Sequence, residues 1–193
     1  MDLPSQLPDL QLEQQKHDEV AHRDILALAA QDRVKHMVLH FAKYSGHFAD
    51  IHESCDDARF VATLVDTFII CLACANTLNF KLKDLTNDTA RAFGTSGTLK
   101  SNDLVAPFSR QFAKITGTMA KACESLDHFE RFDYHGTLER GLAGIALLCM
   151  DAAKKSNIDL VGLTRQRWDR VERRFRSAPV SKNESIRLAA SKT

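Results

Sequence analysis

LHFAKYSGHFADIHESCDD, residues 39–57, returns later in the chain as RQFAKITGTMAKACESLDH, residues 110–128. Aligned without a gap, the two stretches agree at eight positions, which include the Phe-Ala-Lys run and the glycine that follows it. Each is followed by an apolar stretch, and these stretches end alike, CLACANTLNFKL at 71–82 and CMDAAKKSNIDL at 149–160. A tandem duplication predicts an architecture made of two copies of one unit.

The unit is a helical hairpin, because apolar residues recur at helical spacing and no segment has a convincing strand pattern. The spacing predicts helices over 19–54, 59–78, about 103–126, 137–156 and 163–176, the last of them amphipathic and basic. We therefore expect an all-α fold whose core is a four-helix bundle of two repeated hairpins related by a pseudo-twofold axis. The first hairpin spans 19–84, and 104–176 holds the second hairpin with the basic C-terminal helix.

Polar segments lie outside the hairpins. We expect residues 1–18 to be a flexible N-terminal segment, 85–103 a linker with one short helix, and 177–193 a disordered tail. Gly46 and Gly117 recur in both copies. A glycine inside a helix costs about 1 kcal/mol relative to alanine, so we expect these two to allow a neighbouring helix to approach closely.

The composition limits the classes of binding partner that are expected. The net charge of +1 argues against general nucleic-acid binding, although the segment from Arg165 onward contains nine Lys and Arg and only three acidic residues. A solvated tail and a tail that contacts a polyanion or a phosphate both fit that imbalance. The five cysteines are odd in number and mostly in apolar helical context, which favours a reduced, cytoplasmic chain. No apolar run reaches the length of a membrane span, so we expect no membrane partner.

Four stretches carry a resemblance to a known family: AKYSGHFAD (42–50), TLVDTFIICLACANTLNFKL (63–82), SNIDL (156–160) and WDRVERR (168–174). In order and spacing they resemble the MazG-like, all-α nucleoside triphosphate pyrophosphohydrolases. The resemblance implies a nucleotide substrate cleaved to monophosphate and pyrophosphate. It also implies Mg²⁺ or Mn²⁺, which carboxylates paired at i and i+3 on two facing helices hold against the triphosphate. Members of this family usually complete the bundle by dimerising, so a homodimer stays an open alternative.

The chain departs from the family where the metal should bind. Lys43, Tyr44 and His47 replace three glutamates of the first helix, and of the Glu-x-x-Asp pair only Asp66 remains, beside Thr63. The second copy retains no carboxylate at the matching positions, which are Lys114, Ile115, Thr118, Gly141 and Gly144. The candidate metal ligands are His47, Asp50 and Asp66. The candidate substrate-binding residues are Lys43, Tyr44, Asn76 and Arg165.

Two features admit a functional and a structural interpretation. His36, His40, Lys43 and His47 lie near one helix face, where they could form a nucleotide-phosphate or transition-metal site, a polar bundle seam or a solvated face. Asp66 lies in an apolar helix, where it is either a ligand or the partner of a Lys or His that holds two helices in register. Three hypotheses follow: a divergent hydrolase, a ligand-binding protein without hydrolysis, and a helical scaffold for protein interactions.

Overall fold

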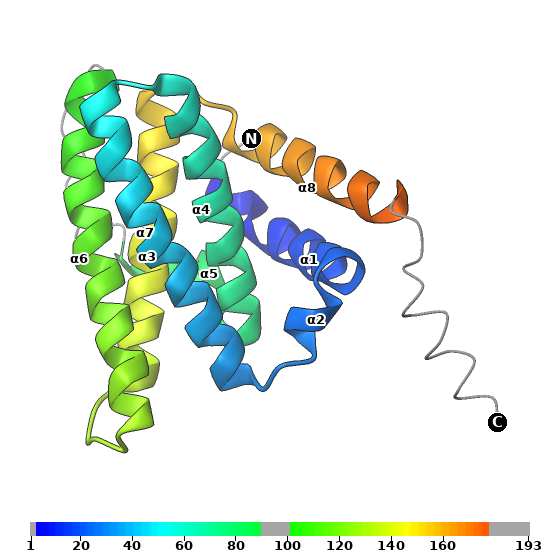
Figure 1. Ribbon diagram of the computed structural model, residues 1–193, viewed down its shortest axis with the longest axis vertical. Helices are drawn as coiled ribbons and strands as arrows, with labels where there is room; N and C mark the ends of the chain where they lie inside the picture. The colour runs from blue at the N-terminus through cyan, green and yellow to red at the C-terminus, as the bar shows by residue number, and fades with distance from the viewer. Residues whose placement is uncertain (1–2, 90–100, 178–193) are drawn as a thin grey trace.

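The structure is a computed structural model that describes residues 3–89 and 101–177. The described residues form eight helices and no strand, which confirms the all-α prediction (Figure 1). The helices are α1 (Leu3–Ala21), α2 (Arg23–Leu26), α3 (Ala30–Ser54), α4 (Asp57–Thr77), α5 (Leu82–Thr89), α6 (Ser101–Asp127), α7 (Tyr134–Lys155) and α8 (Leu160–Ser177).

Four long helices make the bundle. Helices α3 and α4 form the first hairpin and α6 and α7 the second, and α3 packs on α6 while α4 packs on α7 (Figure 1). Each helix turns an apolar stripe inward, so that the largest core side chains are aromatic. Those without measurable exposure include Phe41, Phe48, Phe68 and Phe112.

Equivalent residues of the two repeats meet in the core. Phe41 and Phe112 hold matching positions, and their rings touch edge to face with centroids 6.1 Å apart. Cys71 and Cys149, which also match, are both fully buried, and burial raises the pKa of each thiol. The proximity of Cys149 raises the pKa of Cys71 further. Matching residues of the two repeats thus lie near one another in the core, in agreement with two hairpins related by a pseudo-twofold axis.

Helix α4 is the most apolar of the bundle helices. In the part of the chain that the structure describes, it alone has the length and composition of a membrane span. It nevertheless lies inside the fold, where it contacts α1, α3, α7 and α8, and 61% of its most apolar window is buried. Its apolar character on several sides therefore matches its several helical neighbours.

The N-terminal segment differs from the expectation. Residues 1–18 were predicted to be flexible, and this is wrong for the described residues, because 3–21 form α1. The buried residues Leu7, Leu10, Gln14, His17 and Ala21 are spaced by three and four, as one face of a helix. The predicted helix over 19–54 is also divided, since α1 ends at Ala21, α2 is a separate turn of helix and α3 begins at Ala30.

Helix α1 packs against the basic helix α8 on the α4 side of the bundle (Figure 1). The buried indole Nε1 of Trp168 donates a hydrogen bond to Gln14 Oε1 over 2.8 Å. His17 Nδ1 lies 3.1 Å from Glu172 Oε1. The basic helix α8 is thus held to the fold by α1, a segment whose polar composition predicts flexibility.

The remaining boundaries agree with the sequence to within a few residues. Asp56 and Asp133 cap α4 and α7 by accepting hydrogen bonds from the backbone N–H groups of Arg59 and Gly136. The expected linker begins inside α5 and ends inside α6, and its middle, 90–100, lies outside the described residues. Of the predicted tail, 177–193, only Ser177 is described, as the last residue of α8.

The recurring glycines do not mark close helix contacts. A Cβ atom added to Gly46 or Gly117 would meet nothing within 4 Å, so that expectation is wrong. The close approach lies instead in the second hairpin, where a Cβ at Gly141 would come within 2.6 Å of Met119 Cγ. A Cβ at Gly144 would come within 3.1 Å of Ile115 Cδ1.

Candidate functional site

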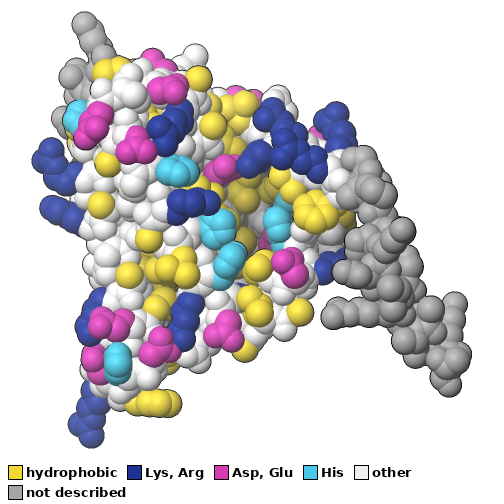
Figure 2. Space-filling view, in the orientation of Figure 1, with side chains coloured by type: hydrophobic (Ala, Val, Ile, Leu, Met, Phe, Trp, Pro, Cys, Tyr) yellow, Lys and Arg dark blue, Asp and Glu magenta, His cyan; other side chains and the backbone are white. Residues whose placement is uncertain are grey.

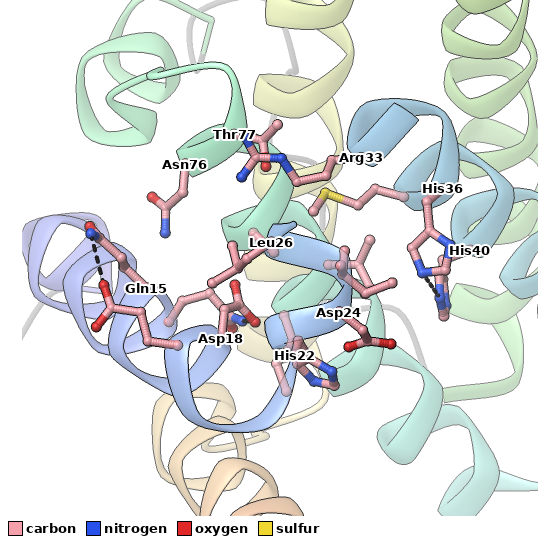
Figure 3. Close-up of a pocket in the computed structure, with 17 residues that line it drawn as sticks. Gln15, Asp18, His22, Asp24, Leu26, Arg33, His36, His40, Asn76 and Thr77 are labelled. Atoms are coloured by element: carbon pink, nitrogen blue, oxygen red, sulfur yellow. Dashed lines mark hydrogen bonds between the residues drawn. The ribbon is translucent and has the colours of Figure 1, made fainter. Parts of the chain in front are cut away.

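A cavity of about 490 Å³ opens between α1, α2, α3 and α4 (Figure 3). We call it the α1–α4 pocket. Its size falls within the range of small-molecule sites. Apolar side chains from three helices cover part of its surface: Ile25, Leu26, Met37, Ile69, Ile70 and Ala73. Figure 2 shows this face of the molecule as hollowed, with histidine side chains gathered around the hollow.

Polar groups of opposite character line two sides of the α1–α4 pocket. Asp18 and Asp24 come from the α1–α2 side, where hydrogen-bond acceptors prevail. Arg33, His36 and His40 come from α3, where donors prevail. A bound molecule would therefore meet carboxylates on one side and nitrogen donors on the other, above an apolar floor.

The acidic side is desolvated. Asp18 accepts a hydrogen bond of 2.8 Å from Gln14 Nε2, yet burial dominates and raises the pKa of its carboxyl. Burial also lowers the pKa of the neighbouring His22 imidazole, against the opposing effect of Asp18. Both shifts have the direction expected where a low dielectric disfavours the charged form.

The α3 side carries a hydrogen-bonded row of side chains. Lys43 Nζ lies 3.2 Å from His40 Nδ1, and His40 Nε2 lies 3.2 Å from His36 Nε2. Because a lysine ammonium only donates, Nδ1 of His40 must accept, which leaves the His40 proton on Nε2 to be donated to His36. Burial, with Lys43 and His36 adding to it, lowers the pKa of His40 to about 4. His40 is therefore a neutral imidazole at physiological pH.

Arg33 contributes an unsatisfied donor. Its Nε is buried and has no hydrogen-bond partner among the described residues. Figure 3 shows the side chain extending from α3 toward the end of α4 that carries Thr77. An unpaired buried donor is costly, so a ligand acceptor placed beside it would gain more than an ordinary hydrogen bond.

The predicted metal ligands are engaged elsewhere. Asp66 accepts two hydrogen bonds from Arg167, of 2.8 Å and 3.3 Å. Asp50 pairs with Arg59 Nη2 over 3.0 Å, and the His47 ring contacts that of Tyr44 at 5.8 Å between centroids. Within the described ranges, no group of three or more His, Cys, Asp or Glu side chains is placed to hold a metal ion. The residues present therefore do not fit the oxygen-rich site that Mg²⁺ requires.

Asp66 does pair with a cation that holds two helices together, as one of the two interpretations predicted. The partner is Arg167 of α8 rather than a Lys or His of the bundle. The carboxylate lies at the edge of a groove of about 300 Å³ between α4 and α8, which Arg167 and Arg170 also line. The structural interpretation of Asp66 thus accounts for the observed contacts.

The predicted substrate-binding residues are dispersed. Asn76 lines the α1–α4 pocket, but its amide is occupied by Gln11, through hydrogen bonds of 2.8 Å and 2.9 Å. Lys43 lies over the Tyr44 ring, 4.6 Å from its centroid, and burial raises the pKa of that phenol. Arg165 lies in the α1–α8 contact, where it forms a bidentate pair with Glu13.

The second hairpin lacks the polar side chains that the first hairpin carries at two matching positions of α4. Gly141 and Gly144 stand where the first hairpin has Thr63 and Asp66, and Met119 and Ile115 fill the space above them. At these positions the second hairpin is closely packed, whereas in the first hairpin Asp66 lines the groove between α4 and α8.

The pocket residues missed by sequence reasoning are Asp18, His22, Asp24 and Arg33. The polar composition of residues 1–18 predicts a flexible segment rather than one side of a pocket, and the break before α3 has no Gly or Pro to mark it. The spacing of the buried α1 residues was the one available signal. No family model, curated protein or solved structure matches this chain.

Proposed function

We propose that the protein binds a nucleotide or nucleotide-like small molecule in the α1–α4 pocket, on a MazG-like helical scaffold, without hydrolysing it. The observation that carries this proposal is the pocket itself, an apolar floor between a carboxylate side and a nitrogen-donor side. The nucleotide class comes from the resemblance of the hairpin sequences. We expect no hydrolysis because the carboxylates of Asp50 and Asp66, the candidate metal ligands, are paired with arginine side chains.

A heterocyclic base suits this arrangement. A planar ring would lie against aliphatic side chains such as Ile69 and Ile70 of α4. Its amino groups would donate to Asp18 or Asp24, and its ring nitrogens or carbonyls would accept from the α3 side. Arg33 Nε, buried without a partner among the described residues, is the donor that gains most from such an acceptor.

Hydrolysis would need chemistry that these residues do not supply. Mg²⁺ binds triphosphates through several oxygen ligands, usually with one or two protein carboxylates. Asp66 and Asp50 are neutralised by Arg167 and Arg59 respectively. Recruiting them would break both ion pairs, so we expect the nucleotide to be bound and released intact.

The test is to measure the binding of a panel of ribo- and deoxynucleoside triphosphates by thermal shift and by calorimetry, with and without Mg²⁺ or Mn²⁺. At a ligand concentration 100 times the dissociation constant, binding stabilises the fold by about 2.7 kcal/mol. Arg33→Gln should weaken binding at least five-fold. Arg59→Gln is the matched control, because Arg59 pairs with Asp50 away from the pocket, and it should bind as the wild type does.

The same samples decide between the alternatives. Chromatography of the nucleotides should show no monophosphate or pyrophosphate above an Asp66→Ala control. Release that depends on Asp66 would establish a hydrolase and overturn the non-hydrolytic proposal. No stabilisation by any nucleotide at millimolar concentration would overturn nucleotide binding and favour a helical scaffold.

A further inference from the structure

We propose that His36 and His40 form a two-histidine site for a borderline transition-metal ion such as Zn²⁺, Ni²⁺ or Co²⁺, on the α3 side of the α1–α4 pocket. The site is distinct from the carboxylate site for Mg²⁺ or Mn²⁺ that the family resemblance implies. It does not depend on nucleotide binding, since both imidazoles are in place in the protein alone.

The geometry of the two rings carries the inference. His36 and His40 lie one helical turn apart, with centroids separated by 4.8 Å and ring planes at 69°. Their Nε2 atoms are 3.2 Å apart. Two imidazole nitrogens bound to one tetrahedral metal, each at about 2.0–2.1 Å, lie about 3.3–3.4 Å from each other. The two nitrogens therefore lie close to the required separation before any metal arrives.

The metal would take the position of the proton between the rings. In the free protein, His40 Nε2–H donates to His36 Nε2 while His40 Nδ1 accepts from Lys43. With a metal on His40 Nε2, the proton moves to Nδ1, which can no longer accept from Lys43. Lys43 is exposed, so its ammonium can turn into solvent. The lysine thus opposes metal binding, through its charge and through the tautomer it favours.

His36 and His40 both line the α1–α4 pocket. Two protein ligands leave at least two positions of a tetrahedral ion to water or to a bound molecule. Figure 3 shows His22 and Asp24 on the opposite side of the pocket from α3. Imidazole nitrogens favour Zn²⁺, Ni²⁺ and Co²⁺ over Mg²⁺ and Ca²⁺, which require oxygen ligands. The expected ion is therefore of the softer class.

Calorimetric titration of the full chain with ZnCl₂ and NiCl₂ tests the site, after removal of metal with EDTA and in the absence of nucleotide. We expect one saturable ion per chain, and Co²⁺ should give visible d–d absorption. His36→Ala and His40→Ala should each lower the affinity at least ten-fold. Lys43→Ala should raise it several-fold, an effect that loss of folding cannot produce. His47→Ala, on the same helix outside the pair, should change it less than two-fold.

Several outcomes would overturn the proposal. The first is that the wild-type protein shows no saturable metal binding. The second is that His36→Ala or His40→Ala keeps full affinity for the metal. The third is that His40→Ala and His47→Ala lose metal affinity equally. Circular dichroism of each variant separates a lost site from a lost fold. Because no nucleotide is present, failure here leaves nucleotide binding untouched, and failure of nucleotide binding leaves this site untouched.

Discussion

Asp66 of α4 and Arg167 of α8 form a bidentate ion pair, with Nε 2.8 Å from Oδ1 and Nη2 3.3 Å from Oδ2. The pair links the bundle to the basic helix beside the groove between α4 and α8. Its two side chains are 29% and 36% exposed, so it is neither fully solvated nor buried. Asp66, which the sequence indicates as a candidate metal ligand, thus attaches helix α8 to the bundle.

Breaking this pair should loosen α8 without unfolding the bundle. We expect Asp66→Asn and Arg167→Gln each to lower the free energy of unfolding by about 0.5–1.5 kcal/mol. A bidentate ion pair that is partly shielded from solvent contributes more to stability than a fully exposed pair does. A double-mutant cycle in urea should give a coupling energy of at least about 0.5 kcal/mol. Arg170→Gln, from the same groove, is the control and should show no coupling with Asp66. Additive effects of Asp66→Asn and Arg167→Gln would mean that the pair holds nothing in place.

Two glycines of the second hairpin region should respond oppositely to alanine. Gly141→Ala would place Cβ 2.6 Å from Met119 Cγ, and overpacking of this kind costs about 1–3 kcal/mol. Gly117→Ala meets nothing within 4 Å on an exposed helix face and should stabilise by about 0.5–1 kcal/mol. Thermal and urea unfolding measure both changes.

Met119→Ala in the Gly141→Ala background identifies the cause. If the clash with Met119 is responsible, the cost of Gly141→Ala should shrink when the methionine is shortened. An equal cost in both backgrounds, or a stabilising Gly141→Ala, would contradict close packing between α6 and α7.

The Gln14–Trp168 hydrogen bond should be among the stronger contributors to the α1–α8 contact. Gln14→Ala leaves the buried Trp168 Nε1 without its acceptor, which costs about 1–3 kcal/mol. Gln15→Ala, one residue along on the exposed face, should stay within about 0.5 kcal/mol of wild type. Urea unfolding followed by Trp168 fluorescence reports both. Equal effects of the two substitutions would show that α1 is not anchored through Gln14.

The bundle could be predicted from sequence because the helical spacing of its apolar residues is a local pattern, and this pattern occurs in both repeats. The Phe41/Phe112 match predicted two equivalent hairpins, and those two rings touch in the core. Helix α1 could not be predicted in the same way, because polar Gln14 and His17 occupy two of its core positions. Their partners, Trp168 and Glu172, lie at the far end of the chain.

The candidate pocket was harder to predict than the fold. The row His36, His40 and Lys43 was visible from helical spacing, and the structure brings these three side chains into contact. The opposite side of the pocket depends on where α1 and α2 turn, which only tertiary packing decides. Asp66 was correctly picked out as unusual, but its partner Arg167 is more than a hundred positions away.

The environment of His40 makes the fold sensitive to acid. Burial lowers the pKa of His40 from an ordinary 6.5 to about 4, with Lys43, His36 and His22 acting in the same direction and Asp66 opposing them. The unfolded chain therefore takes up a proton near pH 6.5, whereas the folded chain does so only near pH 4. The stability that neutral His40 provides is complete above pH 6.5 and is lost as the pH falls toward 4.

His40→Gln should remove this part of the acid sensitivity. Between pH 6.5 and 4, we expect the free energy of unfolding to fall less steeply in His40→Gln than in wild type. The difference should correspond to less than one proton, because the imidazole is only half buried and solvent screens its neighbours. Urea unfolding at pH 4, 5, 6 and 7 measures both slopes, and His47→Gln is the control from the same helix. Parallel curves for wild type and His40→Gln would show that His40 is as readily protonated in the fold as in the unfolded chain, and the hydrogen-bonded row on α3 would then need a different protonation pattern.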